Sequence, residues 1–75
     1  MTIRLIENKR YSFKFKLVWI DLLASNEQIK KKFESAGFKD VSIIGNLKTR
    51  VARATWNKKN TWMEMPYQIF KVQEF

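Results

Sequence analysis

Side chains able to do chemistry are few in this chain, and the commonest kinds are missing. The sequence contains no histidine and no cysteine, which removes the usual general base, the strongest side-chain nucleophile and the commonest zinc ligands. Its 7 Asp and Glu residues follow no metal-binding spacing, and neither a phosphate-binding glycine loop nor a nucleophile motif is found. The sequence therefore predicts a protein that is not an enzyme and that uses no metal or cofactor.

Basic side chains are the remaining candidates for a functional role. Lys and Arg number 15 against 7 Asp and Glu, for a formal net charge of +8. Such an excess favours polyanionic partners, because each cation can neutralise a phosphate and release a counterion. The stretch 41–60 concentrates this charge, since it contains five cations and no acid.

Alternation along the chain predicts that these cations share one face of a sheet. Over residues 12–19, apolar side chains at odd positions alternate with mostly polar ones, which is typical of a half-buried strand with Lys14 and Lys16 on its open face. If Leu47 and Val51 also face the core, the strand 47–56 turns its own cations outward. The predicted nucleic-acid contacts, to DNA or RNA, are Lys14, Lys16, Lys48, Arg50 and Arg53, with Trp56 as a stacking surface.

The same alternation has a plainer interpretation, because any sheet with one solvated face needs polar residues there. A register shift of one residue would also move Trp56 into the core. For the run 30–32, an ordinary solvated helix surface is favoured, since Glu27 and Glu34 lie at ion-pair spacing from its lysines. The lysine pair 58–59 is typical of a polar turn.

Large side chains around Pro66 predict a second function. Trp, Tyr and Met are enriched at the centres of protein interfaces, where they fill pockets. If this segment is exposed, it is a docking surface for an acidic protein or for a second copy of the chain; if it is buried, it closes the core. Its residues are Trp62, Met63, Met65, Tyr67 and Phe70.

Local signals place one helix near the middle of the chain. Ser25 and Gln28 form the S-x-x-Q capping-box pattern, and Gly37 suits the left-handed residue that follows a last turn. We therefore predict a helix over residues 26–36. The predicted strands are 3–6, 12–19, 41–44, 47–56 and 67–75, with Gly45-Asn46 as a hairpin turn and no element assigned to 61–65.

This order, about β-β-α-β-β-β, predicts a small single-domain α+β fold over residues 1–75. It should consist of a mainly antiparallel sheet with one helix packed on one face, and 3–6 should pair with 12–19 as a hairpin. A chain of 75 residues has one small core, and formation of a homodimer is one way to enlarge it. No apolar stretch approaches the ~20 residues of a membrane span, and the absence of cysteine favours the cytoplasm.

Overall fold

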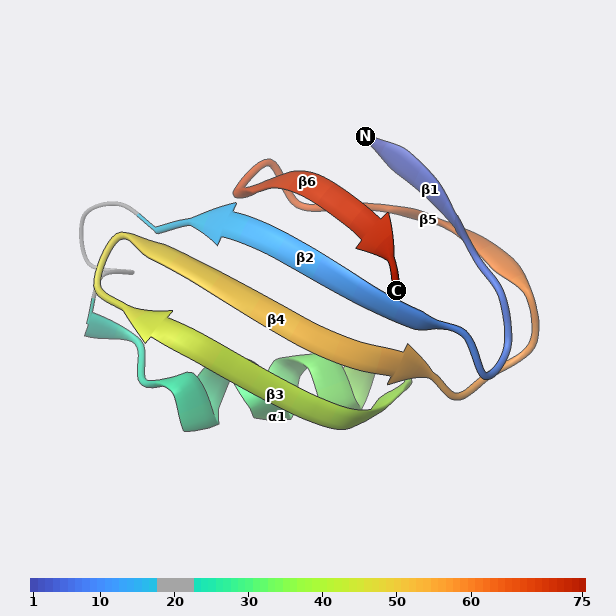
Figure 1. The fold of residues 1–75 in the computed structure, drawn as a ribbon, viewed down its shortest axis with the longest axis horizontal. Coiled ribbons are helices and arrows are strands. Elements are labelled where there is room, and N and C mark those ends of the chain that lie inside the picture. The colour runs from blue at the N-terminus through green and yellow to red at the C-terminus, as the bar shows by residue number, and fades with distance from the viewer. Residues whose placement is uncertain (18–22) are drawn as a thin grey trace.

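The computed structural model describes residues 1–17 and 23–75 and contains one helix and six strands within them. In chain order these are β1 (Thr2–Leu5), β2 (Arg10–Lys16), α1 (Asn26–Ala36), β3 (Phe38–Asn46), β4 (Thr49–Trp56), β5 (Thr61–Glu64) and β6 (Ile69–Glu74). Strands β3, β4, β2 and β6 form an antiparallel sheet in that order, and β1 and β5 form a separate two-stranded ribbon. In Figure 1, α1 lies behind β3 and covers one face of the sheet. The predicted α+β class is confirmed.

Helix α1 has the predicted bounds, and both of its ends are capped as the sequence indicates. The Ser25 hydroxyl accepts a hydrogen bond from the Gln28 backbone N–H, and the Gln28 side chain accepts one from the Ser25 N–H. Gly37 ends the helix with φ of 120°. A Cβ atom there would come within 2.9 Å of the flexible Lys58 side chain and 3.1 Å of the Trp56 ring, and the backbone angle is the main reason that glycine is required.

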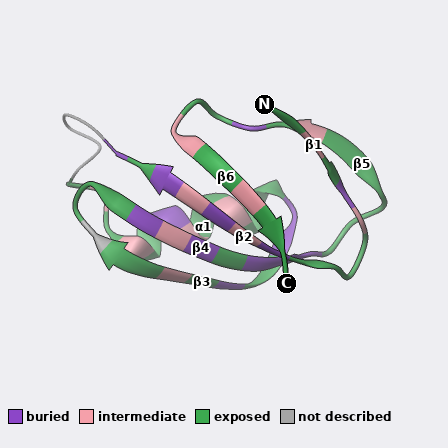
Figure 2. Ribbon diagram, turned by 45° about the horizontal axis from the view of Figure 1, so that its top comes forward, coloured by how far each residue is buried: buried purple, intermediate pink, exposed green. Residues whose placement is uncertain are grey.

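Aromatic rings from β2 build the core against small side chains of β4. Buried residues alternate with more exposed ones along β2 (Figure 2), and Phe13 is fully buried opposite Ala52. The Phe13 ring centroid lies 5.3 Å from that of Phe33 on α1 and 5.4 Å from that of Phe38. Ala52 and Ala54 are likewise fully buried, because only small side chains leave room for these rings.

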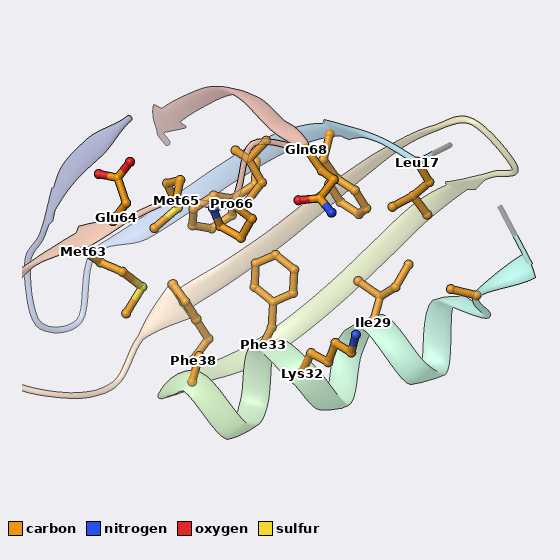
Figure 3. A pocket seen from close by; sticks show the side chains of 15 residues that line it. Leu17, Ile29, Lys32, Phe33, Phe38, Met63, Glu64, Met65, Pro66 and Gln68 are labelled. Atoms are coloured by element: carbon orange, nitrogen blue, oxygen red, sulfur yellow. The ribbon is translucent and has the colours of Figure 1, made fainter. Parts of the chain in front are cut away.

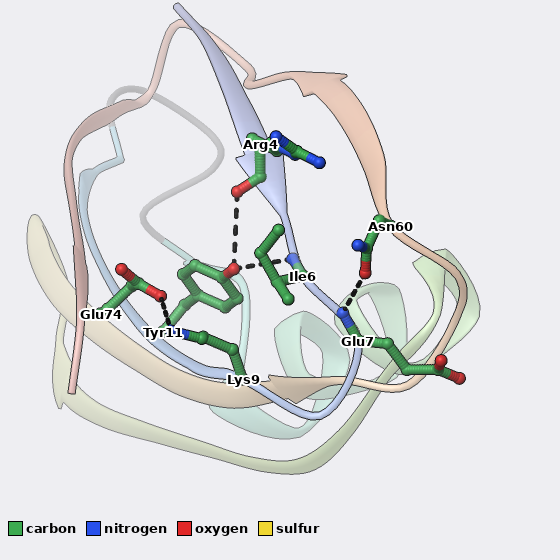
Figure 4. Close-up of polar contacts among 7 residues, drawn as sticks. All are labelled: Arg4, Ile6, Glu7, Lys9, Tyr11, Asn60 and Glu74. Carbon is green, nitrogen blue, oxygen red and sulfur yellow. Dashed lines mark hydrogen bonds and ion pairs between the residues drawn. The ribbon is translucent and has the colours of Figure 1, made fainter.

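The predicted hairpin between 3–6 and 12–19 is wrong, because β1 pairs with β5 instead. The Tyr11 hydroxyl accepts a hydrogen bond from the Ile6 N–H at 2.8 Å and donates one to the Arg4 carbonyl at 3.5 Å (Figure 4). The Asn60 side chain accepts a further bond from the Glu7 N–H. These contacts hold the end of β1 against Tyr11 of β2 and against Asn60, which precedes β5. Strand β5 was not predicted, because apolar and polar side chains do not alternate over residues 61–65.

The turn between β3 and β4 lies two residues later than predicted. Gly45 is inside β3 opposite Arg50, and the turn consists of Leu47 and Lys48, with Leu47 at φ of 53°. Gly45 is needed for a different reason: it has φ of 95°, and a Cβ would approach the Thr49 carbonyl oxygen to 2.7 Å. Strand β4 therefore begins at Thr49 rather than at Leu47.

Strand β2 ends at Lys16, and residues 18 and 19 of the predicted strand 12–19 lie outside the described residues. Strand β6 confirms a strand in the segment 67–75. Within residues 1–17 and 23–75, no helix is long and apolar enough to cross a membrane.

Replacement of Ala52 tests which side of β4 faces the core. We expect Ala52→Leu to lower the free energy of unfolding by about 1–3 kcal/mol, because the larger side chain would push the overlying rings out of place. The control is Val51→Leu on the opposite face, where the change should stay within about 0.5 kcal/mol. Both are measured by urea unfolding. A larger effect of Val51→Leu would contradict the assigned faces.

Candidate functional site

The face of the four-stranded sheet opposite α1 carries a row of basic side chains. Lys14 lies opposite Val51 on β4 and opposite Lys71 on β6, and Ser12 lies opposite Arg53. Directly opposed residues of neighbouring strands project from the same face, and Phe13 and Phe15 between them are buried on the other side. We call this surface the open face. Five of its cations lie on β2, β4 and β6: Arg10, Lys14, Lys16, Arg53 and Lys71. Lys39 on β3 lies at the edge of the same face, opposite Thr55.

Two aromatic rings lie among these cations. The guanidinium carbons of Arg10 and Arg53 lie 4.6 and 5.2 Å from the centroid of the Phe75 ring. The Lys16 ammonium lies 5.5 Å from the centroid of the Phe70 ring. Both rings are about half exposed, at 49% for Phe70 and 53% for Phe75. Each ring therefore combines an accessible apolar surface with an adjacent positive charge.

Carboxylates do not neutralise the open face. In the described part of the chain there are two ion pairs, one between the N-terminal ammonium and Glu64 at 2.8 Å and one between Lys9 and Glu74 at 3.3 Å. Neither uses an open-face cation. None of the residues paired across this face is an acid. The positive charge of the face is therefore available to an external anion.

Arg50 does not belong to this face, and its prediction as a nucleic-acid contact on an outward position is wrong. It lies opposite Phe15 on the helix side of the sheet and is only 3% exposed. Its guanidinium donates to the carbonyl oxygens of Leu47 and Ala24 and to the Asn26 side chain. Arg50 thus connects the start of α1 and the β3–β4 turn to β4, which is a structural role.

Trp56 is also buried, at 2% exposure, so it offers no stacking surface. Its ring packs 4.9 Å from that of Phe38, and its indole N–H donates to the Lys59 carbonyl at 2.9 Å. The prediction failed because it assumed that Leu47 faces inward, whereas Leu47 lies in the turn and is 62% exposed. Even-numbered residues of β4 consequently face the core. Lys48 lies in the same turn, exposed but outside the strand.

The segment around Pro66 divides between the surface and the core. Trp62, Tyr67 and Phe70 are exposed, at 67%, 83% and 49%, whereas Met65 is buried and Met63 is half-buried. Trp62 lies on the ribbon beside Arg4, whose guanidinium carbon is 6.0 Å from its ring. The Phe70 ring instead joins the open face. These five residues therefore do not form one surface.

An apolar cavity of about 430 Å³ separates α1 from residues 63–69 (Figure 3). Ile29 and Phe33 line it from the helix, and Met63 lines it from the other side. Phe13 and Phe15 also line it and are almost fully buried, so the cavity exposes little of the core. Within the described chain, no three acids come together to form a metal site.

The ribbon is closed at its end by a charged contact. The hydrogen bonds from the N-terminal ammonium and from the Thr2 hydroxyl hold the pKa of the Glu64 carboxyl below its ordinary value. A lowered pKa in the folded state means that this contact stabilises the ribbon at neutral pH. That stabilisation is lost as the pH falls through the lowered pKa.

Sequence reasoning missed Arg10, Lys71 and Phe75 as members of the open face. The alternation that selected Lys14 and Lys16 also includes Arg10, which is the first residue of β2. Lys71 and Phe75 were not identified because their place depends on β6 pairing with β2, two elements far apart in the sequence. No local signal determines such a pairing.

Paired substitutions distinguish the buried arginine from the exposed one. We expect Arg50→Gln to lower the free energy of unfolding by about 1–3 kcal/mol, because buried carbonyl groups lose their donors. Arg53→Gln removes the same charge from the open face and should change stability by no more than about 0.5 kcal/mol. Urea unfolding measures both. Equal effects would contradict the structural role of Arg50.

Comparisons with family models, with curated proteins and with solved structures find no match to this chain. The function must therefore be inferred from the arrangement of its own side chains.

Proposed function

We propose that this protein is a non-catalytic nucleic-acid-binding module that uses the open face of its sheet. The observation that carries the proposal is the group of five cations on one face, which no carboxylate of the described chain neutralises. Arg and Lys in such a group contact phosphates and release condensed counterions, which supplies affinity without sequence preference.

The proposed contact set is revised by the geometry. Lys14, Lys16 and Arg53 stay in it, because each projects from the open face. Arg10 and Lys71 replace Arg50 and Lys48, because Arg50 is buried and Lys48 lies in a turn. The net charge of +8 attracts a polyanion from a distance and speeds the encounter.

Salt dependence tests the proposal directly. If all five cations contact phosphates, a plot of log affinity against log salt should have a slope of about −3.5 to −4.5. The double variant Lys14→Gln/Arg53→Gln should reduce the steepness of that slope by about 1.5, because two contacts are lost. Fluorescence anisotropy with labelled oligonucleotides between roughly 50 and 200 mM salt measures it.

The control is Lys31→Gln/Lys32→Gln on α1, which removes the same charge from the helix that covers the other face. It should leave the slope unchanged. An absence of binding to DNA and RNA at low salt would refute the proposal. Equal slopes for the two double variants would show that the open face is not the binding surface.

A protein partner is the second candidate, and the exposure of Trp62 and Tyr67 favours it. Exposed aromatic rings of this kind can anchor an interface, while the positive charge guides an acidic partner. In this case Trp62→Ala should weaken partner binding more than Lys14→Gln/Arg53→Gln.

Polyglutamate serves as a probe that separates these two candidates. We expect an oligonucleotide to bind more tightly than polyglutamate of the same total charge, because guanidinium groups and aromatic rings match phosphates and bases. Competition anisotropy compares the two. Equal or tighter binding of polyglutamate would favour an acidic protein over a nucleic acid.

A further inference from the structure

We infer that the nucleic acid bound is single-stranded and that it lies along β6, with bases stacked on Phe70 and Phe75. This inference rests on the proposed function and specifies its ligand. It starts from the observation that the two aromatic rings of the open face are half exposed, with Lys16 over the Phe70 ring and Arg10 and Arg53 over the Phe75 ring. A ring with an adjacent cation can hold a nucleotide by its base and by its phosphate together.

The positions of the two rings define a path for the nucleic-acid strand. Phe70 and Phe75 are five residues apart, which corresponds to roughly 16 Å at the rise of an extended chain. Lys71 lies between them on β6, directly opposite Lys14 on β2. The order along the path is therefore ring, cations, ring. Since stacked nucleotides of one strand are about 3.4 Å apart, this path accommodates about five nucleotides.

A double helix fits this surface poorly. The axes of the outer strands of a four-stranded sheet lie roughly 14 Å apart, whereas the major groove is about 12 Å wide and admits an α-helix or a two-stranded ribbon. The sheet would have to lie across the outside of the duplex. The bases of a duplex are also stacked on each other, so the two rings would gain no contact with them.

Substitution of the rings tests the inference. The probes are a fluorescein-labelled ten-nucleotide DNA, an RNA of the same sequence, and the corresponding blunt DNA duplex. We expect the single strands to bind more tightly than the duplex. Phe70→Leu and Phe75→Leu should each weaken single-strand binding about 5- to 100-fold, while the duplex affinity and the salt slope stay unchanged.

Two kinds of control accompany these variants. Trp62→Leu removes an exposed ring that also has an arginine beside it but lies on the ribbon, and it should have no effect. Phe70→Tyr and Phe75→Tyr keep the ring and should keep the affinity, which separates stacking from a folding defect. Among unlabelled DNA competitors from three to ten nucleotides long, affinity should rise steeply up to about five nucleotides and little beyond.

Failure of the inference differs from failure of the proposed function. If the duplex binds as tightly as the single strands, or if the leucine variants match Trp62→Leu, the single-strand inference is overturned while the binding function stands. Loss of affinity in the tyrosine variants equal to that in the leucine variants would also overturn it. If none of the three probes binds at low salt, both are refuted.

Discussion

The register of β2 against β4 is the constraint on which the rest of the structure depends. Phe13 lies opposite Ala52, so a large ring on one strand meets a small side chain on the other, and the rings of Phe33 and Phe38 fit above them. A shift of one residue would exchange the two faces of β4. It would place Arg53 in the core and leave the rings of β2 against bulkier neighbours.

This register also separates the apolar and basic surfaces of the sheet. Side chains of the helix and of the β1–β5 ribbon pack with those of the sheet into one apolar core. Trp56 is buried in this core. Arg50 is tolerated on the apolar side because its guanidinium donates hydrogen bonds to backbone carbonyls and to the Asn26 side chain. The other side of the sheet is left with cations and two half-exposed rings.

Two observations distinguish the open face from an ordinary solvated sheet surface. A solvent-exposed surface without a binding role usually carries both acidic and basic side chains. The residues paired across the open face include no acid. A solvated surface also has no need of large rings, and here Phe70 and Phe75 lie beside Lys16, Arg10 and Arg53. Charge alone would suit any polyanion, and the rings are the feature that favours bases.

The sequence by itself determined what depends on neighbours within a few residues: the helix with both its caps, the α+β class, and the outward direction of Lys14 and Lys16. Only the tertiary structure decided the face of Arg50 and Trp56, because the face of β4 is set by which of its residues lie opposite the buried rings of β2. It also decided that β1 pairs with β5 and that β6 brings Lys71 and Phe75 beside β2. Those pairings join residues more than fifty positions apart, and their energy comes from side-chain packing that no local pattern records.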